Sequence, residues 1–175
     1  MPTETQIYTF ISWLNSQGNL AINITGSESN PTAGTALDVF TALDDPHQLW
    51  TMVQGPGSLA PYFFIQSILK DPDGKPLVIS ITGTPGAKAP LAVENPVPAS
   101  NPKIYSQLWT WVASGKTGPS YLASGVNSDL VLNVTGSSET PPPETPIDVF
   151  TANGGRRQFW EPALVEQTPP PPIHP

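Results

Sequence analysis

Apolar and polar positions alternate in short runs along this chain, and this pattern predicts strands rather than helices. Three runs share one pattern, in which aliphatic residues flank a single polar residue and a Thr-Gly pair follows; they span residues 20–26, 77–83 and 130–136. Because successive side chains of a strand point to opposite faces, Ile22 and Ile24 share one face and Asn23 lies on the other. The glycine after each run is typical of a strand that ends in a turn.

Other matching segments accompany these runs. An alternating segment follows each run, at residues 36–42, 90–96 and 146–152, and an aromatic strand is expected before each run, at 8–14, 62–69 and 121–126. Each block of sequence closes on a Gln-x-Trp tripeptide, at residues 48–50, 107–109 and 158–160. A set of segments that recurs three times indicates a repeat architecture, here with four short strands in each block. We therefore predict three repeats, at about residues 6–55, 60–114 and 119–165.

The three repeats are expected to share one core, because a single repeat cannot bury its apolar face alone. Packed around a pseudo-threefold axis, they would enclose that face together. We expect Trp50, Trp109 and Trp160 to be the largest side chains in this core. The side-chain amide of the Gln in each tripeptide is expected to hold the backbone of its own repeat together through hydrogen bonds, with ligand contact as a second role.

This arrangement resembles the ricin-type (ricin B-like) β-trefoil lectins. The resemblance rests on the three Gln-x-Trp tripeptides, each closing a block of four short strands, and it covers about residues 6–167. It implies an all-β fold, a β-trefoil of twelve short strands in three pseudo-threefold repeats. It also implies a lectin domain over residues 1–167, which leaves 168–175 as a proline-rich C-terminal tail.

In that family each repeat can build a shallow sugar site on the outside of the trefoil. The family pattern has an acidic residue at the end of the second strand, a polar residue in the third, an aromatic two residues later, and an Asn just before Gln-x-Trp. Matched residue by residue, it gives as candidate sugar-binding residues Asn23, Asp38, Phe40, His47 and Gln48 in the first repeat and Asn133, Asp148, Phe150, Arg157 and Gln158 in the third. Relative to the family, the carboxylate and the amide have exchanged places, and His47 and Arg157 replace the Asn.

The candidate residues also suit a sugar on chemical grounds. An aromatic ring covers the apolar C–H face of a sugar, and a carboxylate accepts hydroxyl protons through charge-assisted hydrogen bonds. Strand parity places Asp38 with Phe40 on one outward face, and Asp148 with Phe150 on another. The alternative is that both pairs are solvent-facing residues that were duplicated with the repeat.

The second repeat lacks this chemistry. Ser80 is short, Ala92 cannot bond a hydroxyl group, and Glu94 stands where the aromatic residue should be. We therefore predict a degenerate second repeat. Through the family's typical ligands, the resemblance implies a lectin for galactose- and N-acetylgalactosamine-type glycans, with sites in the first and third repeats, no cofactor and no metal site.

The charge and hydropathy of the chain argue against some classes of binding partner. Seven Lys and Arg against fourteen Asp and Glu give a net charge of −7, which argues against nucleic acid and anionic membranes. The apolar runs fall short of the roughly 18 residues of a membrane span, so we expect no direct membrane insertion. The expected partners are glycans of glycoproteins or glycolipids, and the sequence leaves a homodimer open. With no cysteine and no basic-then-apolar leader, we expect a cytoplasmic protein or one secreted without a signal peptide.

An enzyme fits the sequence poorly. The chain has two histidines, and we find neither a strained nucleophile turn nor a glycine-rich phosphate loop. The competing hypothesis is a β-trefoil protease inhibitor that acts through its surface loops, for which the long proline-rich loops would serve. The duplicated Asp-x-Phe pair favours the lectin, because a multivalent lectin gains avidity from repeated sites. A targeting or oligomerisation module is a third alternative.

Overall fold

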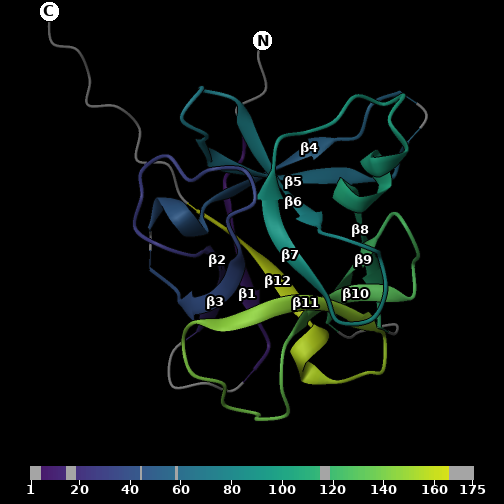
Figure 1. Ribbon diagram of the computed structural model, residues 1–175. Helices are drawn as coiled ribbons and strands as arrows, with labels where there is room; N and C mark the ends of the chain where they lie inside the picture. Colours follow the sequence, from purple (N-terminus) through teal and green to yellow (C-terminus); the bar gives the residue numbers. More distant parts are fainter. Residues whose placement is uncertain (1–4, 15–18, 44, 58, 115–118, 166–175) are drawn as a thin grey trace, which may run out of the picture.

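Twelve strands lie within residues 5–14, 19–43, 45–57, 59–114 and 119–165, which are the residues that the computed structural model describes (Figure 1). In chain order they are β1 (Tyr8–Ser12), β2 (Leu20–Ile24), β3 (Leu37–Thr41), β4 (Trp50–Gln54), β5 (Phe63–Lys70), β6 (Pro76–Ile81), β7 (Ala89–Glu94), β8 (Trp109–Ala113), β9 (Ser120–Ser124), β10 (Leu130–Val134), β11 (Thr145–Thr151) and β12 (Trp160–Leu164). A short 3₁₀ helix precedes the last strand of each repeat: η1 (Pro46–Gln48), η2 (Pro102–Gln107) and η3 (Arg156–Gln158). The aromatic strands differ from their predicted ranges only at their ends. The predicted tail, 168–175, lies outside the described residues.

Six of the strands close a ring by antiparallel pairing. β1 pairs with β12 and β4, β4 with β5, β5 with β8, β8 with β9, and β9 with β12. The first and last strands of each repeat supply this ring. Each of the six is therefore paired on both sides, and the three repeats are joined edge to edge.

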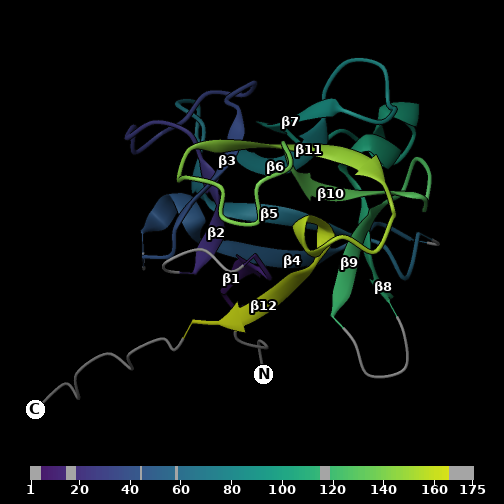
Figure 2. The ribbon, with the colours of Figure 1, turned by 90° about the horizontal axis from the view of Figure 1, so that it is seen from below.

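The second and third strands of each repeat form hairpins on one side of the ring. The hairpins are β2–β3, β6–β7 and β10–β11, and β11 pairs further with β3 and β7. Figure 2 shows β3, β7 and β11 above the ring strands β1, β4 and β12. A six-stranded ring joined to a triplet of hairpins, built from three repeats of four strands, is the predicted β-trefoil.

The tryptophan of each tripeptide fills the core, as predicted. Trp50, Trp109 and Trp160 are 0 %, 0 % and 1 % exposed. Each indole Nε1 donates to a carbonyl in the second strand of its own repeat: Trp50 to Ile22 at 3.3 Å, Trp109 to Ile79 at 3.1 Å and Trp160 to Leu132 at 3.1 Å. Since a buried indole N–H needs a partner, this bond fixes the first residue of the last strand against the centre of the second.

The glutamine of each tripeptide holds the loop that follows the third strand. The Oε1 atom of Gln48 accepts from the Leu43 N–H at 2.8 Å, and its Nε2 donates to the Thr41 carbonyl at 2.9 Å. Two equivalent sets of bonds exist: Gln107 with Val97 and Asn95, and Gln158 with Asn153 and Thr151. All three amides therefore bind backbone, which confirms the structural role expected of them.

Within the residues described, no helix has the length and hydropathy needed to cross a membrane.

Candidate functional site

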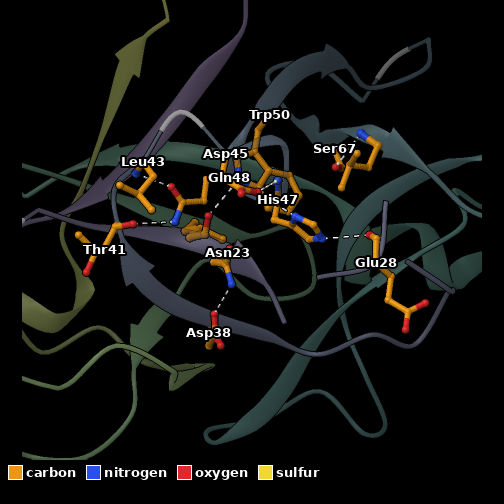
Figure 3. Close-up of polar contacts among 12 residues, drawn as sticks. Asn23, Glu28, Asp38, Thr41, Leu43, Asp45, His47, Gln48, Trp50 and Ser67 are labelled. Atoms are coloured by element: carbon orange, nitrogen blue, oxygen red, sulfur yellow. Dashed lines mark hydrogen bonds and ion pairs between the residues drawn. The ribbon is translucent and has the colours of Figure 1, made fainter. Parts of the chain in front are cut away.

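The first repeat is hollowed at its outer surface, where the β2–β3 hairpin meets η1. The hollow has a volume of about 670 Å³. The structure brings all of the candidate first-repeat residues to it: Asn23, Asp38, Phe40, His47 and Gln48. In Figure 3, Asn23 and Asp38 point toward each other below His47 and Gln48.

Asn23 and Asp38 form a cross-strand pair at the floor of this hollow. They face each other in the β2–β3 register, and the Nδ2 amide of Asn23 donates to Oδ1 of Asp38 at 2.8 Å. The two residues are only 9 % and 5 % exposed, although strand parity places both on the face away from the core. Burial raises the pKa of Asp38 above the ordinary value of 3.8; the hydrogen bond from Asn23 opposes this rise, and the charge of Glu144 adds to it.

The walls of the hollow combine an aromatic ring, an aliphatic side chain and an ordered histidine. Phe40 is half-buried, and Leu43 is 57 % exposed. The ring of His47 has both nitrogens engaged: Nδ1 lies 2.8 Å from Oδ1 of Asp45, and Nε2 lies 3.0 Å from the Glu28 carbonyl. His47 therefore supports the wall and holds the loop at Glu28.

Asp45 caps η1 and holds His47 in place. Its Oδ1 also accepts from the His47 backbone N–H, at 2.9 Å. This N–H, followed by the His47 side chain, keeps the pKa of Asp45 below 3.8. The carboxylate is thus favoured at Asp45, whereas burial disfavours it at Asp38.

The third repeat reproduces the central pair. Asn133 faces Asp148 across β10 and β11, and its Nδ2 donates to Oδ1 of Asp148 at 2.7 Å. Phe150 is half-buried, like its counterpart Phe40. Burial raises the pKa of Asp148, while the hydrogen bond from Asn133 and then the charges of Lys88 and Arg157 act against this rise.

Arg157 is the third-repeat equivalent of His47, and its side chain likewise binds the loop after the second strand of its repeat. Its guanidinium donates to the carbonyls of Val134, Thr135 and Ser138. The Nε atom is buried and has no hydrogen-bond partner among the residues that the structure describes. Arg157 thus holds a loop by its side chain while keeping a positive charge beside Asp148.

The second repeat has a hollow with different chemistry. Ser80 faces Ala92 in the β6–β7 register, so the amide–carboxylate pair is missing. The Ser80 hydroxyl donates instead to the carbonyl of Ile81. The longer loop of this repeat does not close the surface: a cavity of about 910 Å³ lies here, bordered by Glu94 and by Tyr105 of η2.

Sequence reasoning missed the residues that each repeat supplies to its neighbour. The backbone N–H of Glu144 donates to the Val39 carbonyl on β3, that of Lys88 to Val149 on β11, and that of Gly34 to Val93 on β7, each at 2.7 Å. All three donors have left-handed backbone, with φ of 68°, 69° and 94°. Glu144 thereby lines the first-repeat hollow, although it belongs to the third repeat.

Among the described ranges, no cluster of three or more His, Asp or Glu side chains is arranged to hold a metal ion.

Solved structures with this architecture include both designed and natural proteins. The designed 3-fold symmetric protein ThreeFoil is similar with a TM-score of 0.68 and 16% identity, over 92% of this chain and 99% of that one. The C-half of the earthworm R-type lectin, solved in complex with GalNAc, has a TM-score of 0.60 and 18% identity, over 91% and 99% of the two chains. A ricin B-like lectin of Macrolepiota procera, solved in complex with lactose, has a TM-score of 0.62 and 16% identity, over 93% and 98%.

The chain has the fold of the ricin B-like lectins. At these identities the similarity establishes the fold alone. No protein-family model matches the sequence, and no curated protein matches it. The function therefore has to be argued from the residues of the two sites.

Proposed function

We propose that this protein is a lectin that binds galactose- and N-acetylgalactosamine-type glycans through its first and third repeats, without catalysing a reaction. The observation that carries the proposal is a cross-strand Asn–Asp hydrogen bond to a buried Asp, with a Phe two residues after that Asp, present in the first and third repeats and missing from the second. We call Asn23, Asp38 and Phe40 the first-repeat site, and Asn133, Asp148 and Phe150 the third-repeat site.

Each site offers the two kinds of contact that a sugar needs. The Asn amide occupies only Oδ1 of the Asp carboxylate, and within the described residues no other side chain donates to either carboxylate. The second oxygen is thus available to accept hydroxyl protons. Phe40 and Phe150 lie two residues along the same strands, so their rings share a face with the carboxylates and can cover the apolar face of a sugar.

The exchange of carboxylate and amide is compatible with the family's ligands. Asn23 and Asp38 are cross-strand partners joined by a hydrogen bond, as are Asn133 and Asp148. Exchanging two partners keeps one carboxylate and one amide at the floor of the site. The earthworm lectin half and the Macrolepiota procera lectin with this fold were solved with GalNAc and lactose, which supports the choice of galactose-type sugars as the first ligands to test.

A glycan array tests the proposal. We expect the protein to bind glycans with terminal galactose or N-acetylgalactosamine, and the free sugars to compete. The double change Asp38→Asn and Asp148→Asn should abolish this signal, because it removes both carboxylates and keeps their shape. The matched control is Asp73→Asn, at an exposed carboxylate in the β5–β6 turn that should not affect binding. A wild-type array without galactose-type signals, or full binding by the double variant, would contradict the proposal.

A further inference from the structure

The two proposed sites each receive a charged residue from a neighbouring repeat, and the charges have opposite signs. The N–H bond to Val39 places Glu144 at the first-repeat site, and the equivalent bond to Val149 places Lys88 at the third. Val39 and Val149 directly follow Asp38 and Asp148 on their strands. Glu144 and Lys88 are both exposed, so their charged ends are open to a ligand.

The left-handed backbone at these positions favours glycine, so the presence of a charged side chain there is informative. A left-handed φ is unfavourable for residues with a Cβ atom and free of cost for glycine. Glycine is found at the equivalent position beside the second repeat, where the Asn–Asp pair is missing. Beside the two sites that have the pair, the chain instead carries Lys88 and Glu144, at φ of 69° and 68°.

Nearby charged side chains add to the negative charge at the first-repeat site and to the positive charge at the third-repeat site. The first-repeat hollow is lined by three carboxylates, those of Asp38, Asp45 and Glu144, and Asp45 is engaged with His47. At the third-repeat site, Arg157 replaces His47, and its charge joins that of Lys88. Lys88 and Arg157 are two of the seven Lys and Arg of a chain whose net charge is −7, and the charges of both act on Asp148.

Of Lys88 and Arg157, the two cations that act on Asp148, Lys88 is the one whose charged group a ligand can bind directly. The guanidinium of Arg157 is bound to the carbonyls of its loop. In the described part of the chain, the Lys88 side chain makes neither a hydrogen bond nor an ion pair, and it acts on Asp148 only through its charge.

We propose that the third-repeat site selects glycans that carry an anionic group next to the galactose-type sugar, through Lys88, and that the first-repeat site selects neutral glycans, because Glu144 repels such a group. This rests on the proposed lectin function and adds to it the ligand class of each site. The anionic group is a carboxylate or a sulfate, either of which a single ammonium group can pair with through a charge-assisted hydrogen bond.

The test compares lactose with 6′-sialyllactose, which adds a carboxylate to the same disaccharide, in proteins with one site left. Asp38→Asn leaves the third-repeat site, and we expect it to bind 6′-sialyllactose about two- to fivefold more tightly than lactose, the effect of one exposed ion pair. Asp148→Asn leaves the first-repeat site, and the order should be reversed. Both preferences should weaken in concentrated salt, which screens exposed charges.

Neutral substitutions then identify the residues responsible. Lys88→Gln should abolish the preference of the third-repeat site, and Glu144→Gln that of the first, while lactose binding persists in both. Lys75→Gln is the matched control: it removes a positive charge from the β5–β6 turn and should change neither preference. Thermal unfolding of each variant confirms that it is folded.

The outcomes separate this inference from the function on which it rests. If both single-site proteins bind lactose but show the same preference, or if Lys88→Gln leaves the preference intact, the charge selection is wrong and the lectin function stands. If the wild-type protein binds neither sugar, the lectin function is wrong, and the charge selection is overturned with it.

Discussion

At the scale of single residues, the account depends on a buried carboxylate that one amide holds in place. Asp38 and Asp148 are nearly buried, and each accepts one hydrogen bond from its cross-strand Asn. Burial disfavours the charged form of a carboxyl group, which is why the pKa of each is raised. These carboxylates therefore reduce folding stability at neutral pH, and their retention at two sites is consistent with binding.

The first residue-scale prediction concerns stability. A carboxyl group whose pKa is raised on folding destabilises the folded state once the pH rises above that pKa. Asp38→Asn removes the charge and keeps the shape, so the melting temperature at neutral pH should stay level or rise. Thermal unfolding followed by circular dichroism measures this. A clear fall in melting temperature would mean that the carboxylate is a structural element.

The second residue-scale prediction concerns binding and pH. If the Asp38 carboxylate accepts sugar hydroxyl protons, binding is lost as the pH falls through the pKa of Asp38, which lies above the ordinary value of 3.8. Glu144 helps to raise this pKa, so Glu144→Gln should move the loss of lactose binding to lower pH. Titrations across the acid range with the Asp148→Asn protein isolate the site. An unchanged midpoint would show that Glu144 does not act on Asp38.

At the scale of elements, each repeat is fixed by contacts from its last strand to its second strand and loops. Trp50 bonds β4 to the centre of β2, and the Gln48 amide binds both sides of the loop after β3. Strand parity and the tripeptide repeat predicted these elements and the faces that they bury. Parity alone did not predict that Asn23 is buried, because the hollow around it is formed by a 3₁₀ helix and a loop from another repeat.

Truncation of the core tryptophan tests how much the contact between β4 and β2 contributes to stability. Trp50→Ala should lower the free energy of unfolding by about 3–5 kcal/mol, the usual cost of truncating a buried aromatic residue. Urea unfolding followed by circular dichroism gives the value. Trp13→Ala is the matched control, since Trp13 is 44 % exposed and should tolerate truncation. Equal effects of the two substitutions would be incompatible with a core built around Trp50.

The loop after β10 offers a second test at this scale. Arg157 donates to three carbonyls there, and Arg157→Ala leaves all three without that partner. We expect faster amide hydrogen exchange in residues 135–138, with unchanged exchange in the loop after β2, which His47 holds. Exchange measured by mass spectrometry resolves the two loops. Unchanged exchange after β10 would show that Arg157 does not hold this loop.

At the scale of the whole molecule, the three repeats are similar in backbone and different in surface chemistry. The repeated blocks predicted a core shared by three repeats, because each repeat needs the other two to bury its apolar face, and the resemblance to the ricin-type lectins implied the trefoil. The difference in charge between the first-repeat and third-repeat sites could not be predicted in the same way. Glu144 and Lys88 belong to repeats other than the ones whose sites they adjoin, and their left-handed backbone has no sign in the sequence.

A calorimetric titration with lactose tests the central claim of two duplicated sugar sites most directly. The account predicts two lactose molecules bound per wild-type chain, one per chain in Asp38→Asn and in Asp148→Asn, and none in the double variant, with all four proteins folded. Binding by the double variant at wild-type stoichiometry would show that the sugar is bound elsewhere and would contradict the assignment of both sites.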